Sequence, residues 1–542
     1  MKSKFIYTLA MGALLAACTS NFDDLNTESG TYGPNEQAMD KKGYTMYFSP
    51  IQQGIYFNYN YGSGTDWTFQ TMQNLGVDMF AGYFHDMASK FAQYNSVYNL
   101  NDGWNSTNWT YSYAQTISAL NKAEDADAEF PQYMCLIKIY RVATLHRLAD
   151  QYGPILYSNN HNQPAEPESL ESAYTKMFTD LDDAINTIDQ ILANGTEDKV
   201  PFDILMRTKS TYSQYAKWAN SLRLRLAMRV SNVNSKLAGE QAAKALKDKH
   251  GLLETNADMV EVSTKTGYKN PLGTIGLSWW EVYMNASLES FLGGYNDPRT
   301  AKYFTPSVGG QVADDNGKKL GPTPLFDYAG MQKGIPQGYN YNTPAEVNHY
   351  KFHSRCTIDA NTPAPIMTPA EVWFLRAEAA LRGYSTENVK DCYERGVRVS
   401  FEQWGAQGVD EYLASDAKPA DYKDVFFEKN NMKAMTNITP KWDESASKDV
   451  KLERIITQKW LAIFPEGAEA WAEQRRTGYP KLFKVLTNNS NEIDTDKMIR
   501  RLPFPANLKT DQPTLYQQLV EKLGAADNGA TNLWWDAGKN NF

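Results

Sequence analysis

Histidine and cysteine are scarce in this chain. It has six histidines and four cysteines among 542 residues. Three of the cysteines, Cys135, Cys356 and Cys392, show no CxxC spacing, and an odd number of thiols is no disulfide framework. We therefore predict that these three thiols pack as small buried apolar groups.

Sequence motifs of catalysis are also missing. The chain has no GxSxG elbow, no Walker loop and no GxGxxG after a predicted strand. His349 and His353 have the spacing of two zinc ligands on a helix, but they lie in a proline-rich region without an HExxH motif. Acidic residues are numerous enough for a paired-carboxylate glycosidase, yet carboxylates at this density are usually solvated helix faces. We predict that the protein is not an enzyme, that it uses no cofactor and that these histidines form no zinc site.

Clustered basic charge is absent, and the chain carries a formal net charge of −9. A nucleic-acid partner is not expected, because phosphate binding needs clustered positive charge. The apolar run Phe5–Ala17 is too short to span a bilayer as a stable helix. It therefore predicts a cleaved signal peptide, not a membrane anchor.

The end of this run has the pattern of a lipoprotein. Two lysines precede the run, and it ends in Leu-Ala-Ala-Cys at Cys18. This resembles the bacterial lipobox, in which the cysteine is acylated and becomes the first residue after cleavage. We predict a signal peptide over 1–17, acylation of Cys18 and a flexible polar tether over 18–40, so that acyl chains hold the protein in outer-membrane lipid. The alternative is an ordinary signal peptide followed by an incidental cysteine.

Helical periodicity dominates the rest of the chain. Apolar residues step by three or four positions in two long stretches: Tyr174, Met177, Leu181, Ile185, Ile188 and Leu192, then Tyr215, Ala219, Leu222, Leu226 and Val230. Thr368-Pro369 has the pattern of a helix start. Further helices are predicted over Tyr111–Asp127, Pro131–Asp150, Glu240–Lys249 and Val450–Phe464. Such recurring helices favour a mainly α fold built as a helix–turn–helix solenoid, although no clean 34-residue repeat can be read.

Two stretches interrupt the helical pattern, at about 251–365 and about 405–448. The first is rich in Gly, Pro, Asn and Thr, and turns are marked by pairs such as Asn270-Pro271 and Gly321-Pro322. We predict that both are loop-rich insertions, the first with short strands, within a single domain over 41–542. Long loops on a rigid helical scaffold are where binding sites usually lie.

Four segments resemble motifs of the SusD/RagB family, in the expected order along the chain. They are Arg147–Ile155 (RLADQYGPI), Lys217–Ala227 (KWANSLRLRLA), Thr368–Ala379 (TPAEVWFLRAEA) and Gln458–Pro480, which contains QKWLAIF and RRTGYP. With the lipobox, the resemblance covers nearly the whole chain. It implies an α/α superhelical solenoid with tetratricopeptide-like helix pairs plus an irregular loop-rich lobe. It also implies a surface-exposed outer-membrane lipoprotein that captures glycan and delivers it to a partner TonB-dependent β-barrel transporter.

The resemblance leaves alternatives open. Asp23-Asp24 is similar to the export signal of Bacteroidetes lipoproteins that face the cell exterior, but it is also compatible with a plain linker. The RagB side of the family is linked to peptides, so capture of peptide or glycopeptide is the second candidate function, and a purely structural adaptor is the third. Most motif residues are expected to be structural; Arg475 and Arg476, for example, are expected to pair with carboxylates between helices.

Aromatic residues are unusually frequent, at 13% of the chain. Tryptophan and tyrosine rings stack on the flat C–H faces of sugars, and amides or carboxylates satisfy sugar hydroxyls. The predicted ligand-binding residues lie in four loop clusters: Trp104, Asn105 and Trp109; Asp66 and Trp67 beside Tyr61; Trp279 and Trp280 beside Tyr283; and Tyr295 beside Asn296 and Asp297. Trp104 and Trp109 are preferred because the stretch between them is rich in Asn and Thr. For each ring the alternative is packing in the core or in the lobe.

Overall fold

The computed structural model describes residues 46–56, 66–86, 91, 93–161, 166–307, 312–313, 319–320, 334–339, 353–424, 428–536 and 540–542. The predicted lipidation site Cys18, the tether over 18–40, Tyr61 and His349 lie outside these ranges. Residues Tyr47–Phe542 form one compact unit.

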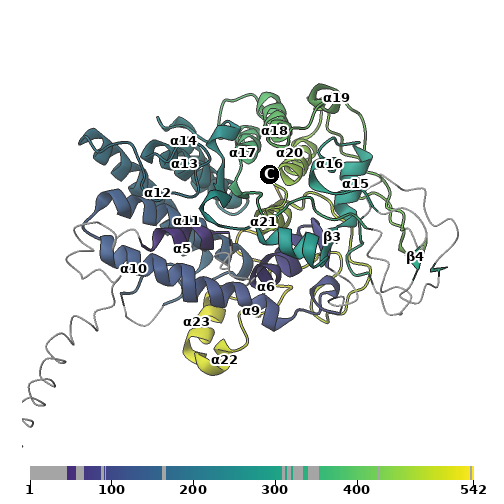
Figure 1. Cartoon of the computed structure of the whole chain (residues 1–542), viewed down its shortest axis with the longest axis horizontal. Coiled ribbons are helices and arrows are strands. Elements are labelled where there is room, and N and C mark those ends of the chain that lie inside the picture. Colours follow the sequence, from purple (N-terminus) through teal and green to yellow (C-terminus); the bar gives the residue numbers. More distant parts are fainter. Residues whose placement is uncertain are drawn as a thin grey trace, which may run out of the picture. The chain divides into compact units, whose positions relative to one another are not determined.

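Long helices form the framework of the fold (Figure 1): α10 (Ser118–Asp127), α11 (Pro131–Tyr152), α12 (Leu170–Ala193), α13 (Tyr212–Arg229), α14 (Ser235–Lys247), α17 (Pro369–Leu381), α18 (Val389–Trp404), α20 (Lys448–Ala462) and α21 (Gly467–Thr477). Helix α11 packs against α12, α12 against α13, and α13 against α14. Helix α13 also contacts α17, which packs against α18 and α20, while α11 contacts α21. Successive helices are thus neighbours in space, which confirms the predicted mainly α solenoid of helix pairs.

Shorter elements surround this framework: α5 (Phe48–Gly54), α6 (Asp66–Phe69), η1 (Gln70–Val77), α7 (Asp78–Phe80), β1 (Phe84–Asp86), η2 (Asn95–Val97), α9 (Asp102–Tyr111), η3 (Ser112–Ile117), η4 (Asn256–Asp258), β2 (Val260–Val262), η5 (Thr264–Thr266), η6 (Gly273–Ser278), β3 (Val282–Met284), α15 (Ala286–Gly294), α16 (Thr300–Tyr303), β4 (Val312–Ala313), β5 (Lys319–Leu320), β6 (Ala364–Met367), α19 (Val409–Leu413), η8 (Glu428–Asn430), α22 (Leu508–Asp511) and α23 (Pro513–Leu523). The strands form antiparallel pairs, β1 with β3, β2 with β6 and β4 with β5. In the first pair, Phe84 lies opposite Met284 and Asp86 opposite Val282.

Local sequence signals explain the bounds of the long helices. Oγ1 of Thr368 accepts a hydrogen bond from the backbone N–H of Glu371 at 3.1 Å, and Pro369 takes the first helical position of α17, as predicted. The apolar stripe of α12 is buried from Tyr174 to Ile188, while Leu192 at its end is half-buried. Gly478, with φ of 78°, ends α21 in the left-handed conformation that favours glycine.

Buried ion pairs join the helices at the centre of the scaffold. Arg225 on α13 binds Glu371 on α17 through two hydrogen bonds, Nε to Oε1 at 2.8 Å and Nη2 to Oε2 at 2.7 Å. Lys459 on α20 reaches Oε1 of Glu469 on α21 at 2.8 Å. Because each of these groups is almost completely buried, their pairing is needed to offset lost hydration.

Of the two neighbouring arginines expected to pair with carboxylates, only Arg476 does so. Arg475 instead donates from Nη1 to the backbone oxygen of Arg500 at 2.7 Å, and its guanidinium lies 3.6 Å from the ring centre of Trp471. No carboxylate of the described residues forms an ion pair with it. Burial in this site lowers the pKa of Arg475 well below its usual range.

In the described part of the region between α14 and α17, short strands and short helices alternate with irregular segments. This region includes the nine-residue helix α15, which the sequence pattern does not predict. Asn285 starts this helix, because its side chain accepts a hydrogen bond from the backbone N–H of Ser287 at 2.8 Å. The second insertion likewise contains the short helix α19.

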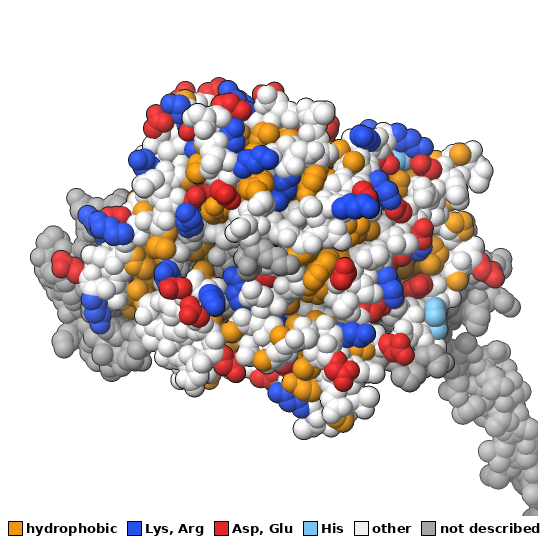
Figure 2. All heavy atoms as spheres, turned by 180° about the vertical axis from the view of Figure 1, so that it is seen from behind, with side chains coloured by type: hydrophobic (Ala, Val, Ile, Leu, Met, Phe, Trp, Pro, Cys, Tyr) orange, Lys and Arg blue, Asp and Glu red, His pale blue; other side chains and the backbone are white. Residues whose placement is uncertain are grey.

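The described surface is mixed in charge. On the face shown in Figure 2, Lys and Arg side chains lie among Asp and Glu side chains, with apolar groups between them. Within the described ranges, no helix has both the length and the apolar character needed to cross a membrane. Cys135, Cys356 and Cys392 are buried free thiols, as predicted.

Candidate functional site

Two short elements bring together aromatic residues that are far apart in the sequence. Helix α6, which carries Trp67, contacts η6, the π-helix that ends directly before Trp279 and Trp280. The side-chain amide of Gln70 donates to Oε2 of Glu281, the residue after Trp280, at 2.6 Å. In Figure 1, α6 and β3, which begins just after Glu281, lie in the same region of the molecule. The structure therefore joins two of the four predicted clusters.

Three tryptophans at this junction are exposed: Trp67 by 46%, Trp279 by 39% and Trp280 by 40%. Trp67 meets Tyr111, at the end of α9, edge to face with ring centres 6.1 Å apart. We call Trp67, Tyr111, Trp279 and Trp280 the aromatic cluster. Exposed rings of this kind can stack on apolar faces of a ligand, such as the C–H face of a sugar.

Trp280 is held in a strained backbone conformation. Its φ is 59°, in the left-handed region, which costs a residue with a Cβ roughly 1–2 kcal/mol. Backbone hydrogen bonds on both sides fix this turn, from Trp279 to Thr274 at 2.8 Å and from Glu281 to Ile275 at 3.0 Å. A bulky, exposed ring at a position suited to glycine makes Trp280 a candidate for contact with a ligand.

π-Helical segments adjoin the aromatic cluster. Segment η1 begins directly after α6, η3 begins directly after Tyr111, and η6 ends directly before Trp279. These three are the π-helices found in the described ranges. Such segments are rare and frequently occur at functional sites.

Arg355 covers one side of Trp280, with Cζ 4.0 Å from the ring centre. The backbone around Arg355 is fixed on both sides, since Thr305 donates to its carbonyl at 2.8 Å and Met284 donates to the carbonyl of Ser354 at 2.9 Å. Sequence analysis missed Arg355, because it meets Trp280 only through tertiary structure. Tyr111 was also missed, although it follows Trp109 closely in an aromatic-rich segment.

The preferred candidates, Trp104, Asn105 and Trp109, lie on helix α9 and not in a loop, so that expectation is wrong. Asn101 starts this helix by accepting a hydrogen bond from the backbone N–H of Trp104 at 3.1 Å. The prediction failed because Asn, Ser and Thr are weak helix formers, and tertiary packing overrides their preference here.

The side chains of these three residues face other parts of the protein. Trp109 is 5% exposed and packs against Tyr113, Tyr152 and Phe504, with ring centres 4.8, 5.4 and 5.6 Å away. Asn105 is buried and exchanges two amide hydrogen bonds with Asn95, at 2.8 and 3.2 Å. Trp104 is half-buried against Phe91 and Tyr94. Their part in ligand binding stays a prediction.

The other two predicted residues are also buried. Asp66 on α6 is 7% exposed, next to the exposed Trp67. Tyr295, at the end of α15, is 3% exposed, and its hydroxyl donates to the carbonyl of Ile438 at 2.9 Å. The neighbouring Asp297 binds Arg299 inside the protein at 2.6 Å. The structure does not place Tyr295 in the aromatic cluster.

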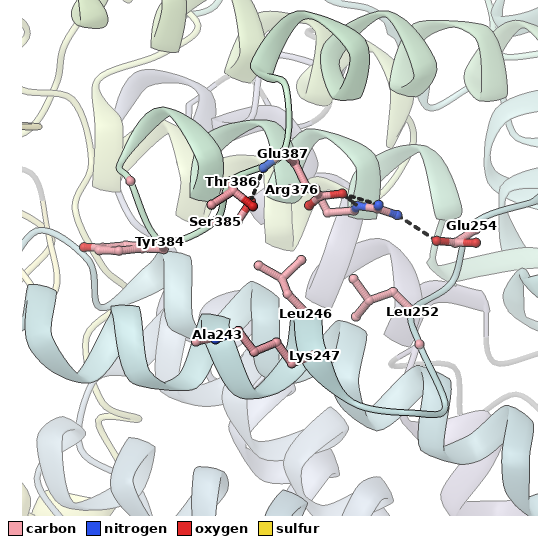
Figure 3. A pocket seen from close by; sticks show the side chains of 12 residues that line it. Ala243, Leu246, Lys247, Leu252, Glu254, Arg376, Tyr384, Ser385, Thr386 and Glu387 are labelled. Carbon is pink, nitrogen blue, oxygen red and sulfur yellow. Dashed lines mark hydrogen bonds and ion pairs between the residues drawn. The ribbon is translucent and has the colours of Figure 1, made fainter.

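A separate cavity of about 390 Å³ lies between α14 and the loop after α17 (Figure 3). Leu246 and Leu252 supply apolar surface. Arg376 donates to Oε1 of Glu254 at 2.8 Å and, from Nε, to Oε1 of Glu387 at 2.9 Å. Because this arginine is already satisfied by two carboxylates, the aromatic cluster is the stronger candidate for a ligand site.

No group of three or more His, Cys, Asp or Glu side chains that could hold a metal ion occurs among the described residues. His353, one of the two histidines with helical spacing, is buried.

The fold is a solenoid of helix pairs, and the exposed rings of the aromatic cluster lie on short helices and at the end of a π-helix beside it. A family model described as SusD-like, Susd and RagB outer membrane lipoprotein, matches residues 24–536. The chain therefore belongs to the SusD-like family, which confirms the resemblance and places it among outer-membrane lipoproteins.

Solved structures match across nearly the whole chain. A SusD homologue from Bacteroides vulgatus is 44% identical, with a TM-score of 0.86, and the match covers 93% of this chain and 100% of that one. A chitin-binding SusD homologue from Flavobacterium johnsoniae is 34% identical, with a TM-score of 0.83 over 92% of this chain and 100% of that one. A SusD homologue from Bacteroides thetaiotaomicron is 30% identical, with a TM-score of 0.78 over 91% and 99%. A search of curated proteins found no match.

Proposed function

We propose that this protein captures glycan at the cell surface, without catalysis, and delivers it to a partner TonB-dependent transporter in the outer membrane. The observation that carries the proposal is the aromatic cluster, in which three exposed indoles stand on a SusD-like scaffold. The chitin-binding homologue from Flavobacterium johnsoniae supports a glycan as the ligand.

The cluster offers the apolar contact that a sugar needs. Trp67 and Trp279 present ring surface for stacking. Gln70 and Glu281, both buried, join the two segments that carry these rings through a hydrogen bond of 2.6 Å. We assign the main contacts to Trp67, Trp279 and Trp280. The buried candidates Asp66, Asn105, Trp109 and Tyr295 would act by supporting the lobe from within.

A glycan and peptide array tests the ligand class on the full-length lipoprotein, purified in detergent. We expect binding to glycans and loss of that binding in Trp67→Ala. Binding to peptides alone would replace glycan capture by peptide capture, the second candidate function.

The anchor is tested at Cys18. We expect a tagged palmitate to label the native protein and not Cys18→Ala, which should be released from the membrane. Equal labelling of both proteins would refute the proposed lipid anchor.

The transporter partnership is tested by gentle detergent extraction of a C-terminally tagged chain. A permanent complex buries on the order of 2,000 Å² or more, so a TonB-dependent transporter should be recovered in near-equal amount. Recovery of the lipoprotein alone, under conditions that preserve other such complexes, would argue against delivery.

A further inference from the structure

Arg355 differs from Arg376, which also lies over a tryptophan ring. Arg376 lies 3.8 Å from the ring centre of Trp373, and two carboxylates bind its guanidinium, as Figure 3 shows. Arg355 lies 4.0 Å from the ring centre of Trp280, yet no carboxylate of the described residues forms an ion pair with it.

Among the described residues, no carboxylate pairs with the guanidinium of Arg355. Its backbone is fixed by hydrogen bonds from Thr305 to its own carbonyl and from Met284 to the carbonyl of Ser354, and its guanidinium lies over the indole of Trp280. No hydrogen bond from its side chain to another described residue is present, although Arg355 is half-buried. Five N–H donors are therefore held beside an exposed indole, and no described residue accepts from them.

The net charge of the whole chain bears on what Arg355 could bind. The chain carries a net charge of −9, with 63 acidic residues against 54 basic ones. Arg225 and Arg476 on the scaffold are matched by carboxylates, whereas Arg475 donates to backbone carbonyls. In a chain with surplus acid, the side chain of Arg355 has neither kind of partner among the described residues, which points to an anion supplied by the ligand. The planar guanidinium fits carboxylate and sulfate groups through paired hydrogen bonds.

We infer that the ligand of the aromatic cluster is an anionic glycan, with uronate carboxylates or sulfate esters, and that Arg355 recognises its charge. This inference rests on the proposed glycan capture and narrows it. In this arrangement Trp67 and Trp279 stack on sugar rings, while Arg355 donates two N–H groups to one anionic substituent.

The experiment compares glycans that differ only in charge, by calorimetric titration of the full-length lipoprotein in detergent. One pair is a galacturonic acid oligosaccharide and its full methyl ester, and the second is a keratan oligosaccharide with and without sulfate. A neutral chito-oligosaccharide completes the set. We expect the charged member of at least one pair to bind about tenfold or more tightly than its neutral counterpart, and less tightly as salt is raised.

Variants of Arg355 separate direct recognition from a general charge effect. Arg355→Gln should weaken binding of the charged glycan about 10- to 100-fold and leave the neutral member unchanged. Arg355→Lys keeps the charge but loses the paired hydrogen-bond geometry. Its affinity for the charged glycan should therefore lie between that of the native protein and that of Arg355→Gln. Arg398→Gln is the control: it removes one positive charge from the exposed pair that Arg398 on α18 forms with Asp410 on α19, and it should change neither affinity. All three variants should keep the native melting temperature, since Arg355 has no ion pair with a described residue and the Arg398–Asp410 pair is at the surface.

The outcomes distinguish this inference from the proposed function. Equal binding of charged and neutral members, binding of neutral glycans alone, or an unchanged preference in Arg355→Gln would overturn the role of Arg355 while glycan capture stands. Absence of binding to every charged probe would also overturn the role of Arg355. If peptides bound and no glycan did, both the role of Arg355 and the proposed glycan capture would be refuted.

Discussion

Arg476 on α21 and Glu378 on α17 form two parallel hydrogen bonds, Nη1 to Oε1 and Nη2 to Oε2, each 2.7 Å long. Both side chains are fully buried, and Glu473 also binds Arg476, from Oε2, at 2.7 Å. This geometry ties two helices that are distant in the sequence into one orientation. The RRTGYP motif, which carries much of the family resemblance, therefore serves the scaffold through Arg476.

Glu378→Gln should destabilise the protein in a pH-dependent way. Burial alone would raise the pKa of Glu378, but Arg476 and Arg382 hold it below its ordinary value of 4.5. The stabilisation is thus fully present above about pH 4.5 and is lost as the pH falls through the lower, folded-state pKa. We expect a loss of roughly 3–5 kcal/mol in the free energy of unfolding at neutral pH, because the buried Arg476 loses one of its two carboxylates and Arg382 loses its pairing with Glu378.

Urea unfolding at neutral pH and at acid pH measures both effects. The difference between wild type and Glu378→Gln should shrink at acid pH, where the wild-type carboxyl is itself protonated. Glu240→Gln is the control, since Glu240 and its partner Lys236 are both exposed, and it should change stability by less than about 0.5 kcal/mol. A difference that stays constant between the two pH values would contradict the assignment to ionised Glu378.

Trp109→Ala should act on stability. The ring is 5% exposed and touches three other aromatic rings, so its removal leaves a cavity in the protein. We expect a loss of roughly 3–5 kcal/mol, the range for emptying a buried aromatic site. Thermal melting of Trp109→Ala is compared with that of Trp67→Ala, which removes an exposed ring and should leave the melting temperature almost unchanged. A native melting temperature for Trp109→Ala would show that the ring is not part of the core.

The outcome for α9 shows what the sequence could and could not predict. The long helices have local signals, such as the stripe of α12 and the Thr368-Pro369 start of α17, and these predict their place well. Helix α9 has weak local signals, because its Asn, Ser and Thr residues favour loops. Its stability comes from contacts with residues far along the chain, including Tyr152, whose ring packs on Trp109.

The same limit applies to the candidate site. Exposed aromatic residues could be suggested from composition, and Trp67, Trp279 and Trp280 were among those proposed. Their proximity depends on the contact between α6 and η6, which no local pattern encodes. The position of Arg355 over Trp280 likewise arises from extended segments that pair only in the folded chain.

Trp67→Ala and Trp279→Ala should weaken ligand binding with little effect on stability. Loss of an aromatic anchor at a binding site costs roughly 1–3 kcal/mol, or about 5- to 150-fold in affinity. Phe202→Ala is a matched control, because Phe202 is 62% exposed and also has a left-handed φ of 58°, but it lies in the turn between α12 and α13. Calorimetric titration with the glycan found on the array measures the change. Equal losses in Phe202→Ala and Trp67→Ala would remove the aromatic cluster as the specific site.

Two substitutions of Trp280 separate the role of its ring from the strain in its backbone. Trp280→Gly and Trp280→Ala both remove the indole, so both should lose ligand affinity to the same extent. Only glycine also relieves the steric conflict at a φ of 59°. We therefore expect the glycine variant to be more stable than the alanine variant by about 1 kcal/mol, measured by urea unfolding. If the alanine variant were equally stable or more so, the backbone at Trp280 would not be strained. Backbone strain would then no longer support a ligand contact for this ring.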